Sequence, residues 1–148
     1  MTLRRTRVYF WLFLVTLSAT AGCSSSPVKI DLAKPEANLN SVAMAYTDSI
    51  QANGNGPANV EQLKKALAVT APVTGIQPDE VLISPNDGEP FVIIWNIKMS
   101  AGGTPIIAYE RKGKDGKRLV VDLRKMPYYV TEAEFKKLTF PAGHKPEN

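Results

Sequence analysis

The chain has little of what metal centres and nucleophilic sites need: it has one cysteine and one histidine in 148 residues. A lone cysteine cannot form an internal disulfide, and a zinc site needs several cysteine or histidine ligands at short spacings. His144 stands four residues from the C-terminus, where a histidine is usually solvated. The sequence therefore has no zinc-ligand cluster, and a serine hydrolase would lack a plausible base.

Other catalytic signatures are also missing. There is no Gly-x-Ser-x-Gly elbow, and the glycines of "GNGPAN" and "GKDGK" do not have the spacing of a phosphate-binding loop. We therefore expect no cofactor. Paired carboxylates are the catalytic arrangement that remains, either Asp87 with Glu89 in a turn or Glu110 with Asp122 on neighbouring strands.

A salt bridge is the more ordinary use of such carboxylates. Glu110 with Arg118 or Arg124, across paired strands, is the combination that we expect. A small carboxylate-dependent envelope hydrolase is therefore the alternative to a non-catalytic protein of structural or interaction type.

The N-terminus is typical of an export signal. Three arginines among the first seven residues precede residues 8–17, which are apolar except for Thr16, and small residues occupy positions 18–22. The apolar run is about half of the roughly 20 residues that a membrane-spanning helix needs, and it matches the short apolar region of a secretory signal. An uncleaved signal-anchor is the alternative interpretation.

The cysteine follows this signal directly. "TAGC", Thr20 to Cys23, resembles the lipobox of bacterial lipoproteins, with small residues at the two positions before the cysteine. Members of that family usually carry leucine where this chain has Thr20. The resemblance implies that Cys23 is lipidated through sulfur, becomes the new N-terminus and is then N-acylated. The partner of the chain would be a bacterial membrane, reached through this anchor, with the domain facing the periplasm or the exterior.

Cleavage after residue 22 changes the charge of the chain. It removes three of the 18 basic residues and none of the 14 acidic ones, so 15 basic residues remain against 14 acidic. Nucleic-acid binding needs a concentrated basic face, and we expect none. Residues 1–22 are interpreted as the signal peptide, 23–37 as a flexible tether, 38–140 as a single domain and 141–148 as a disordered tail.

The domain begins with helices. Leu39, Val42, Tyr46 and Ile50 recur at spacings of three and four, with Asn38 or Asn40 as the cap and Asn53-Gly54 at the end. After the turn "NGNGP", a second helix is expected from Asn59, whose side chain can cap the amide of Gln62. Pro72, Gly75 and Pro78 then predict a loop.

The period changes in the middle of the chain. We expect strands at Phe91 to Met99, Thr104 to Lys112 and Lys117 to Leu123, with Asp115-Gly116 as a hairpin turn and a possible short strand at Val81 to Ser84. Trp95 and Ile107 are expected in or near the core. A helix at "TEAEFKKL" begins with a capping box of Thr131 and Glu134. Helices followed by an antiparallel meander and a short C-terminal helix indicate an α+β fold.

This order of elements resembles that of a known family. "NLNSVAMAYTDSIQANGNGPANVEQLKKAL" and "SPNDGEPFVIIW" are similar to the segment after the spine helix and to the start of the sheet in pseudopilin-like proteins of type II secretion, including a related domain of unknown function. The resemblance covers roughly residues 38–125 and implies a pilin-like head. The chain lacks the prepilin-peptidase site and the apolar spine of about 20 residues. A head anchored by lipid in place of the spine is what this departure indicates.

Two further sites are candidates. Arg111, Lys112, Lys114, Lys117 and Arg118 surround the hairpin turn and form a candidate contact surface for anionic lipid or an acidic partner, although a charged turn also protects a sheet from aggregation. Oxygen atoms of Asn86, Asp87 and Glu89 form a weak calcium candidate, because calcium prefers such ligands. A plain turn is the favoured interpretation of the same residues.

Overall fold

The computed structural model describes residues 34–74, 77–98, 103–124 and 126–147. The helices α1 (Pro35–Asn53), α2 (Val60–Thr74) and α3 (Pro78–Val81) come first. The strands β1 (Val92–Ile93), β2 (Ile106–Tyr109), β3 (Lys117–Asp122) and β4 (Tyr128–Thr131) follow, and α4 (Glu132–Phe135) comes last. The strands form one antiparallel sheet in the order β1-β2-β3-β4, which confirms the expected α+β meander.

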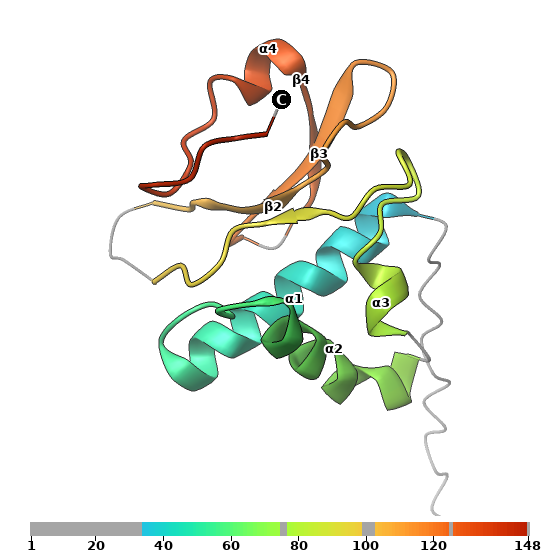
Figure 1. Cartoon of the computed structure of the whole chain (residues 1–148), viewed down its shortest axis with the longest axis vertical. Helices are drawn as coiled ribbons and strands as arrows, with labels where there is room; N and C mark the ends of the chain where they lie inside the picture. The colour runs from blue at the N-terminus through green and yellow to red at the C-terminus, as the bar shows by residue number, and fades with distance from the viewer. Residues whose placement is uncertain (1–33, 75–76, 99–102, 125, 148) are drawn as a thin grey trace, which may run out of the picture.

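The elements form three layers (Figure 1). Helix α1 contacts β2 and β3 on one face of the sheet, and α2 contacts α1 and α3. Helix α4 contacts β3 and β4, and it lies with the C-terminal segment on the other side of the sheet. The sheet is therefore covered on both faces, and all four residues of β2 are buried.

Helix α1 begins earlier than the sequence indicated. Pro35 occupies the first turn, where its missing N–H costs nothing, and Lys34 precedes it without a side-chain cap. The expected cap Asn38 lies inside the helix and is buried, and its Nδ2 donates to the carbonyl oxygen of Ile83 at 3.2 Å. The expected tether therefore extends too far, because residues 35–37 are helical. The end of α1 is as predicted: Gly54 has φ 75° and its amide donates to Ile50.

The predicted strand from Phe91 to Met99 is wrong beyond Ile93, because Tyr46 of α1 binds the chain there. The buried Tyr46 hydroxyl donates to the Ile94 carbonyl at 2.7 Å and accepts the Ile97 amide at 3.1 Å. Asn96 between them has φ 58°, in the left-handed region. The described backbone from position 94 thus bends around a side chain of α1 and does not extend β1.

The turn after α1 holds this bend from the other side. The Gly56 amide donates to Ile97 and the Asn96 amide to Pro57. A Cβ at Gly56 would overlap the Tyr46 ring, so glycine is needed there for close approach. Because of the bend, Trp95 turns outward and is 37% exposed, which contradicts its expected place in the core. Ile107 is fully buried, as expected.

Other boundaries also differ. Val81 to Ser84 is not a strand, since Val81 ends α3 and only Ile83 forms an isolated bridge, with Pro90. Helix α2 extends to Thr74, past the expected break at Pro72, and the fourth strand is β4, which the sequence did not indicate. Helix α4 is shorter than "TEAEFKKL". The caps are as predicted: Asn59 Oδ1 accepts the Gln62 amide at 3.0 Å, and Thr131 and Glu134 form the capping box.

Candidate functional site

The buried carboxylate of Glu110 is held by hydrogen bonds. Its Oε1 accepts from Ser84 Oγ at 2.5 Å and from Asn86 Nδ2 at 2.8 Å, and its Oε2 accepts the Leu119 amide at 2.8 Å. Three donors compensate for the lost hydration of a buried carboxylate. The expected salt bridge of Glu110 with Arg118 or Arg124 is therefore wrong.

The two arginines bind other acids. The Glu110 amide donates to the Leu119 carbonyl, so the side chains of Glu110 and Leu119 lie on the same face of the sheet. Arg118 precedes Leu119 in β3 and therefore points to the opposite face, where its Nη2 donates to Glu132 Oε2 at 3.1 Å. The guanidinium carbon of Arg118 also lies 4.5 Å from the centroid of the Phe135 ring. Arg124 donates through Nε to Asp122 at 2.8 Å.

Glu110 and Asp122 are not placed for two-carboxylate chemistry. Asp122 pairs with Ile106, four residues before Glu110, and four strand residues span about 13 Å. Paired glycosidase carboxylates are about 5–10 Å apart. Both side chains are also buried, with exposed fractions of 0% for Glu110 and 1% for Asp122. This geometry does not favour the hydrolase alternative.

The loop of Asn86, Asp87 and Glu89 forms a turn that fastens the β2–β3 hairpin. Asp87 Oδ2 accepts the amides of Lys112 and Gly113, both at 3.0 Å, and its Oδ1 accepts the Glu89 amide. Glu89 forms an ion pair with Lys112 at 3.0 Å. A calcium ion would have to displace these donors, and the described residues contain no cluster of three or more metal-ligating acids, histidines or cysteines.

The five residues of the candidate contact surface differ in their exposure and in their ion pairs. Arg118 is buried against Glu132, Arg111 lies 3.0 Å from Glu147 and Lys112 pairs with Glu89. Lys114 and Lys117 are exposed at the hairpin tip and form no ion pair with the residues that the structure describes. The turn between them has φ 51° at Asp115 and φ 72° at Gly116, as a two-residue hairpin turn requires.

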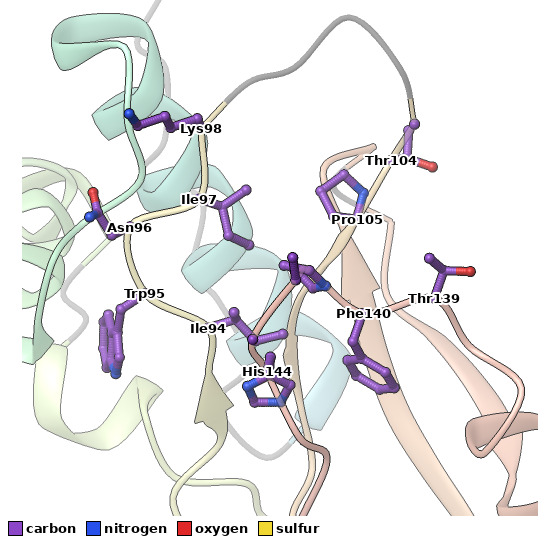
Figure 2. A pocket seen from close by; sticks show the side chains of 14 residues that line it. Ile94, Trp95, Asn96, Ile97, Lys98, Thr104, Pro105, Thr139, Phe140 and His144 are labelled. Carbon is purple, nitrogen blue, oxygen red and sulfur yellow. The ribbon is translucent and has the colours of Figure 1, made fainter.

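A groove of about 1140 Å³ lies between residues 94–98 and the segment 139–144, beside the start of β2. Figure 2 shows Ile94 and Ile97 turned toward the side of Phe140 and His144, and the Trp95 ring turned away from them. One wall of the groove thus belongs to the C-terminal segment, whose position decides how open the groove is.

The expectation of a disordered tail is wrong for residues 141–147. His144 Nε2 lies 3.1 Å from the Tyr109 hydroxyl, which also accepts the Glu147 amide at 3.1 Å. Arg118 Nη1 donates to the Glu147 carbonyl at 2.8 Å. The sequence did not indicate this site. The one available signal was Phe140, an aromatic side chain directly before the segment interpreted as disordered; it packs on Tyr109 and Phe135 with centroid distances of 5.7 and 5.4 Å.

Burial shapes the titration of this site. It is the largest cause raising the pKa of Tyr109, and it lowers the pKa of His144, against the smaller opposing effect of the Glu147 carboxylate. Since the Tyr109 oxygen already accepts the Glu147 amide, its proton is available for His144 Nε2. The contact therefore suits a neutral His144 with its proton on Nδ1.

Cys23 lies outside the described residues, as do the signal and most of the expected tether. Among the helices that the structure does describe, none is both long and apolar enough to cross a membrane.

Comparison with known proteins found no matching family model, no similar curated protein and no similar solved structure. The function is therefore inferred from the chain itself.

Proposed function

We propose that the chain is a non-catalytic lipoprotein of the bacterial cell envelope, anchored through Cys23, whose domain acts by contact with a partner. The "TAGC" motif after a short apolar run carries the anchor. The α+β order of the domain is compatible with the resemblance of residues 38–125 to pseudopilin heads, and a relation to such heads is part of the proposal.

The candidate catalytic acids already form hydrogen bonds within the domain, and this supports a non-catalytic role. Glu110 is enclosed by Ser84, Asn86 and Leu119. Asp87 binds the hairpin amides. A general acid or base must reach its substrate within hydrogen-bond distance, and these groups are already used to join elements of the domain.

The position of the hairpin supports an orientation relative to the membrane. Asn38 near the start of α1 binds Ile83, and Asp87 a few residues later binds Gly113 of the hairpin. Figure 1 shows the start of α1, the 84–89 turn and the hairpin on one side of the molecule. The described chain thus begins on the same side of the molecule as the hairpin that carries Lys114 and Lys117, and each lysine near an anionic membrane surface contributes about 1 kcal/mol.

Replacement of the anchoring residue tests the proposal. Wild-type protein expressed in bacteria should incorporate labelled fatty acid and partition into detergent, and Cys23→Ser should abolish both. Ser24→Ala is the matched control and should leave both unchanged. Wild-type protein that is soluble and unacylated, with Met1 retained, would refute the lipoprotein proposal.

Crosslinking in intact cells tests the contact role. Lys114→Glu with Lys117→Glu should lower crosslinking to lipid or partner, while Lys136→Glu with Lys137→Glu, exposed on the last turn after α4, should not. An equal yield in both variants would exclude the hairpin tip. Turnover of an envelope substrate that is lost in Glu110→Gln would instead establish the hydrolase.

A further inference from the structure

One residue of the C-terminal segment is bound through three of its groups. The Glu147 amide donates to the Tyr109 hydroxyl at 3.1 Å, and its carbonyl accepts from Arg118 Nη1 at 2.8 Å. Its carboxylate Oε2 lies 3.0 Å from Arg111 Nε. Two of these contacts are made by side chains to peptide backbone, and the third is made to a carboxylate. They would therefore be available to any acidic residue in an extended peptide.

An apolar contact lies three residues earlier in the segment. The His144 ring packs on Tyr109 and Phe140, with centroid distances of 5.8 and 5.5 Å. Phe135 packs edge-on against Tyr109 at 5.0 Å and completes the aromatic wall. The site thus combines an aromatic surface with a cationic end, two features that recur where proteins bind peptides.

The domain holds the side chains of Tyr109 and Arg118 more firmly than it holds the segment 141–147. Tyr109 is fully buried and Arg118 is 5% exposed, and Arg118 is fixed by Glu132 and by the Phe135 ring. Between residues 141 and 147 there is neither a helix nor a strand, and the one backbone hydrogen bond within the segment joins the His144 amide to Pro141. The side chains of Arg111 and Glu147 are 42% and 49% exposed, and an exposed ion pair contributes little.

We propose that Tyr109, Arg111 and Arg118 form a peptide-binding site, which the chain's own segment 141–147 occupies and from which an extended acidic peptide of an envelope partner displaces it. The preformed side chains keep the site ready, and the segment competes as a tethered ligand at millimolar effective concentration. Displacement also moves one wall of the groove at residues 94–98. This inference names the partner class for the contact role proposed above and rests on that role, but it does not depend on acylation of Cys23.

Competition with a synthetic peptide tests the site. The probe is a fluorescent peptide with the sequence of residues 141–148, PAGHKPEN, added to the full chain and followed by polarisation. The double variant His144→Ala/Glu147→Ala weakens the internal ligand without touching the folded layers. We expect it to bind the peptide about tenfold more tightly than wild type does, which corresponds to about 1.4 kcal/mol.

Two controls establish which atoms bind. The same peptide with glutamine in place of glutamate should bind the double variant about twofold more weakly, as expected for an exposed ion pair, and adding Arg111→Gln to the protein should remove that difference. Lys137→Ala, an exposed residue away from the site, should change nothing. Chemical shifts at residues 109–118 identify where the peptide binds.

Several outcomes would overturn the inference. They are the absence of saturable binding to the folded double variant, equal affinity for wild type and double variant, equal affinity for the two peptides, and binding outside residues 109–118. Each would leave the labelled-fatty-acid result for Cys23→Ser unaffected, so failure of the peptide site and failure of the lipid anchor are distinguishable.

Discussion

The two faces of the sheet are covered by different kinds of contact. On one face, α1 contributes Leu39, Val42 and Ile50 to a core that consists mainly of aliphatic side chains. On the other face, α4 and the C-terminal segment bring Phe135 and Phe140 against Tyr109. The first face is built from a long regular helix, whereas the second depends on a four-residue helix and an irregular segment. The second face is therefore covered by the less regular part of the fold.

Truncation in the two faces gives the largest expected effects. Leu119 and Phe135 are buried to 0% and 1% exposure. Leu119→Ala should lower the free energy of unfolding by about 2–5 kcal/mol and Phe135→Ala by about 3–5 kcal/mol, measured by chemical denaturation. Phe140→Ala, at a half-buried position, is the control and should cost less. If Phe135→Ala costs under about 1 kcal/mol, the packing of Phe135 on Tyr109 does not belong to the cooperative fold.

Removal of the Tyr46 hydroxyl has the next largest effect. Tyr46→Phe leaves the Ile94 carbonyl and the Ile97 amide without their partner, so we expect a loss of about 2–3 kcal/mol in urea unfolding. Burial raises the pKa of Tyr46 to about 12, so its phenol should stay protonated when exposed tyrosines ionise in an alkaline absorbance titration. Tyr129→Phe, at an exposed side chain, is the control. A loss equal to that of the control would show that the bend at residues 94–97 does not need the hydroxyl.

The smallest expected effect is a loss of stability of the C-terminal segment, on the second face of the sheet, when the pH is lowered. The pKa of His144 is lowered in the folded chain, whereas in the unfolded chain it is about 6.5. Between these two pKa values the unfolded chain binds more protons than the folded chain does. The stabilising contribution is therefore complete above about pH 6.5 and is lost as the pH falls through that window. The protection factor of the Glu147 amide, which is the exchange rate relative to that of an unstructured chain at the same pH, should therefore fall between pH 7.5 and pH 5.5.

The matched variant separates this effect from the carboxylates. His144 is the one histidine of the chain, so His144→Gln should remove this loss of protection, while the protection of the α1 amides keeps its dependence on pH. An identical pH dependence of Glu147 in wild type and His144→Gln would show that His144 does not hold the segment.

Much of the fold was predictable from short stretches of sequence. The helical spacing of Leu39, Val42 and Tyr46 indicated a buried helix face, and all three are fully buried. The candidate site was only partly predictable. The sequence identified Arg111 and Arg118 as cations but not their acids, because Glu132 and Glu147 reach them from 14 to 36 residues away in the chain.

The sequence by itself determined the features that need only neighbouring residues. Asp115-Gly116 tolerates the positive φ of a tight hairpin turn, and Thr131 with Glu134 satisfies the orphan amides of its own helix. The tertiary structure decided the rest. Trp95 faces solvent because a tyrosine 48 residues before Ile94 binds the chain at that point. The C-terminal segment is ordered because Tyr109 and Arg118 offer partners to its backbone, and only folding brings those side chains to it.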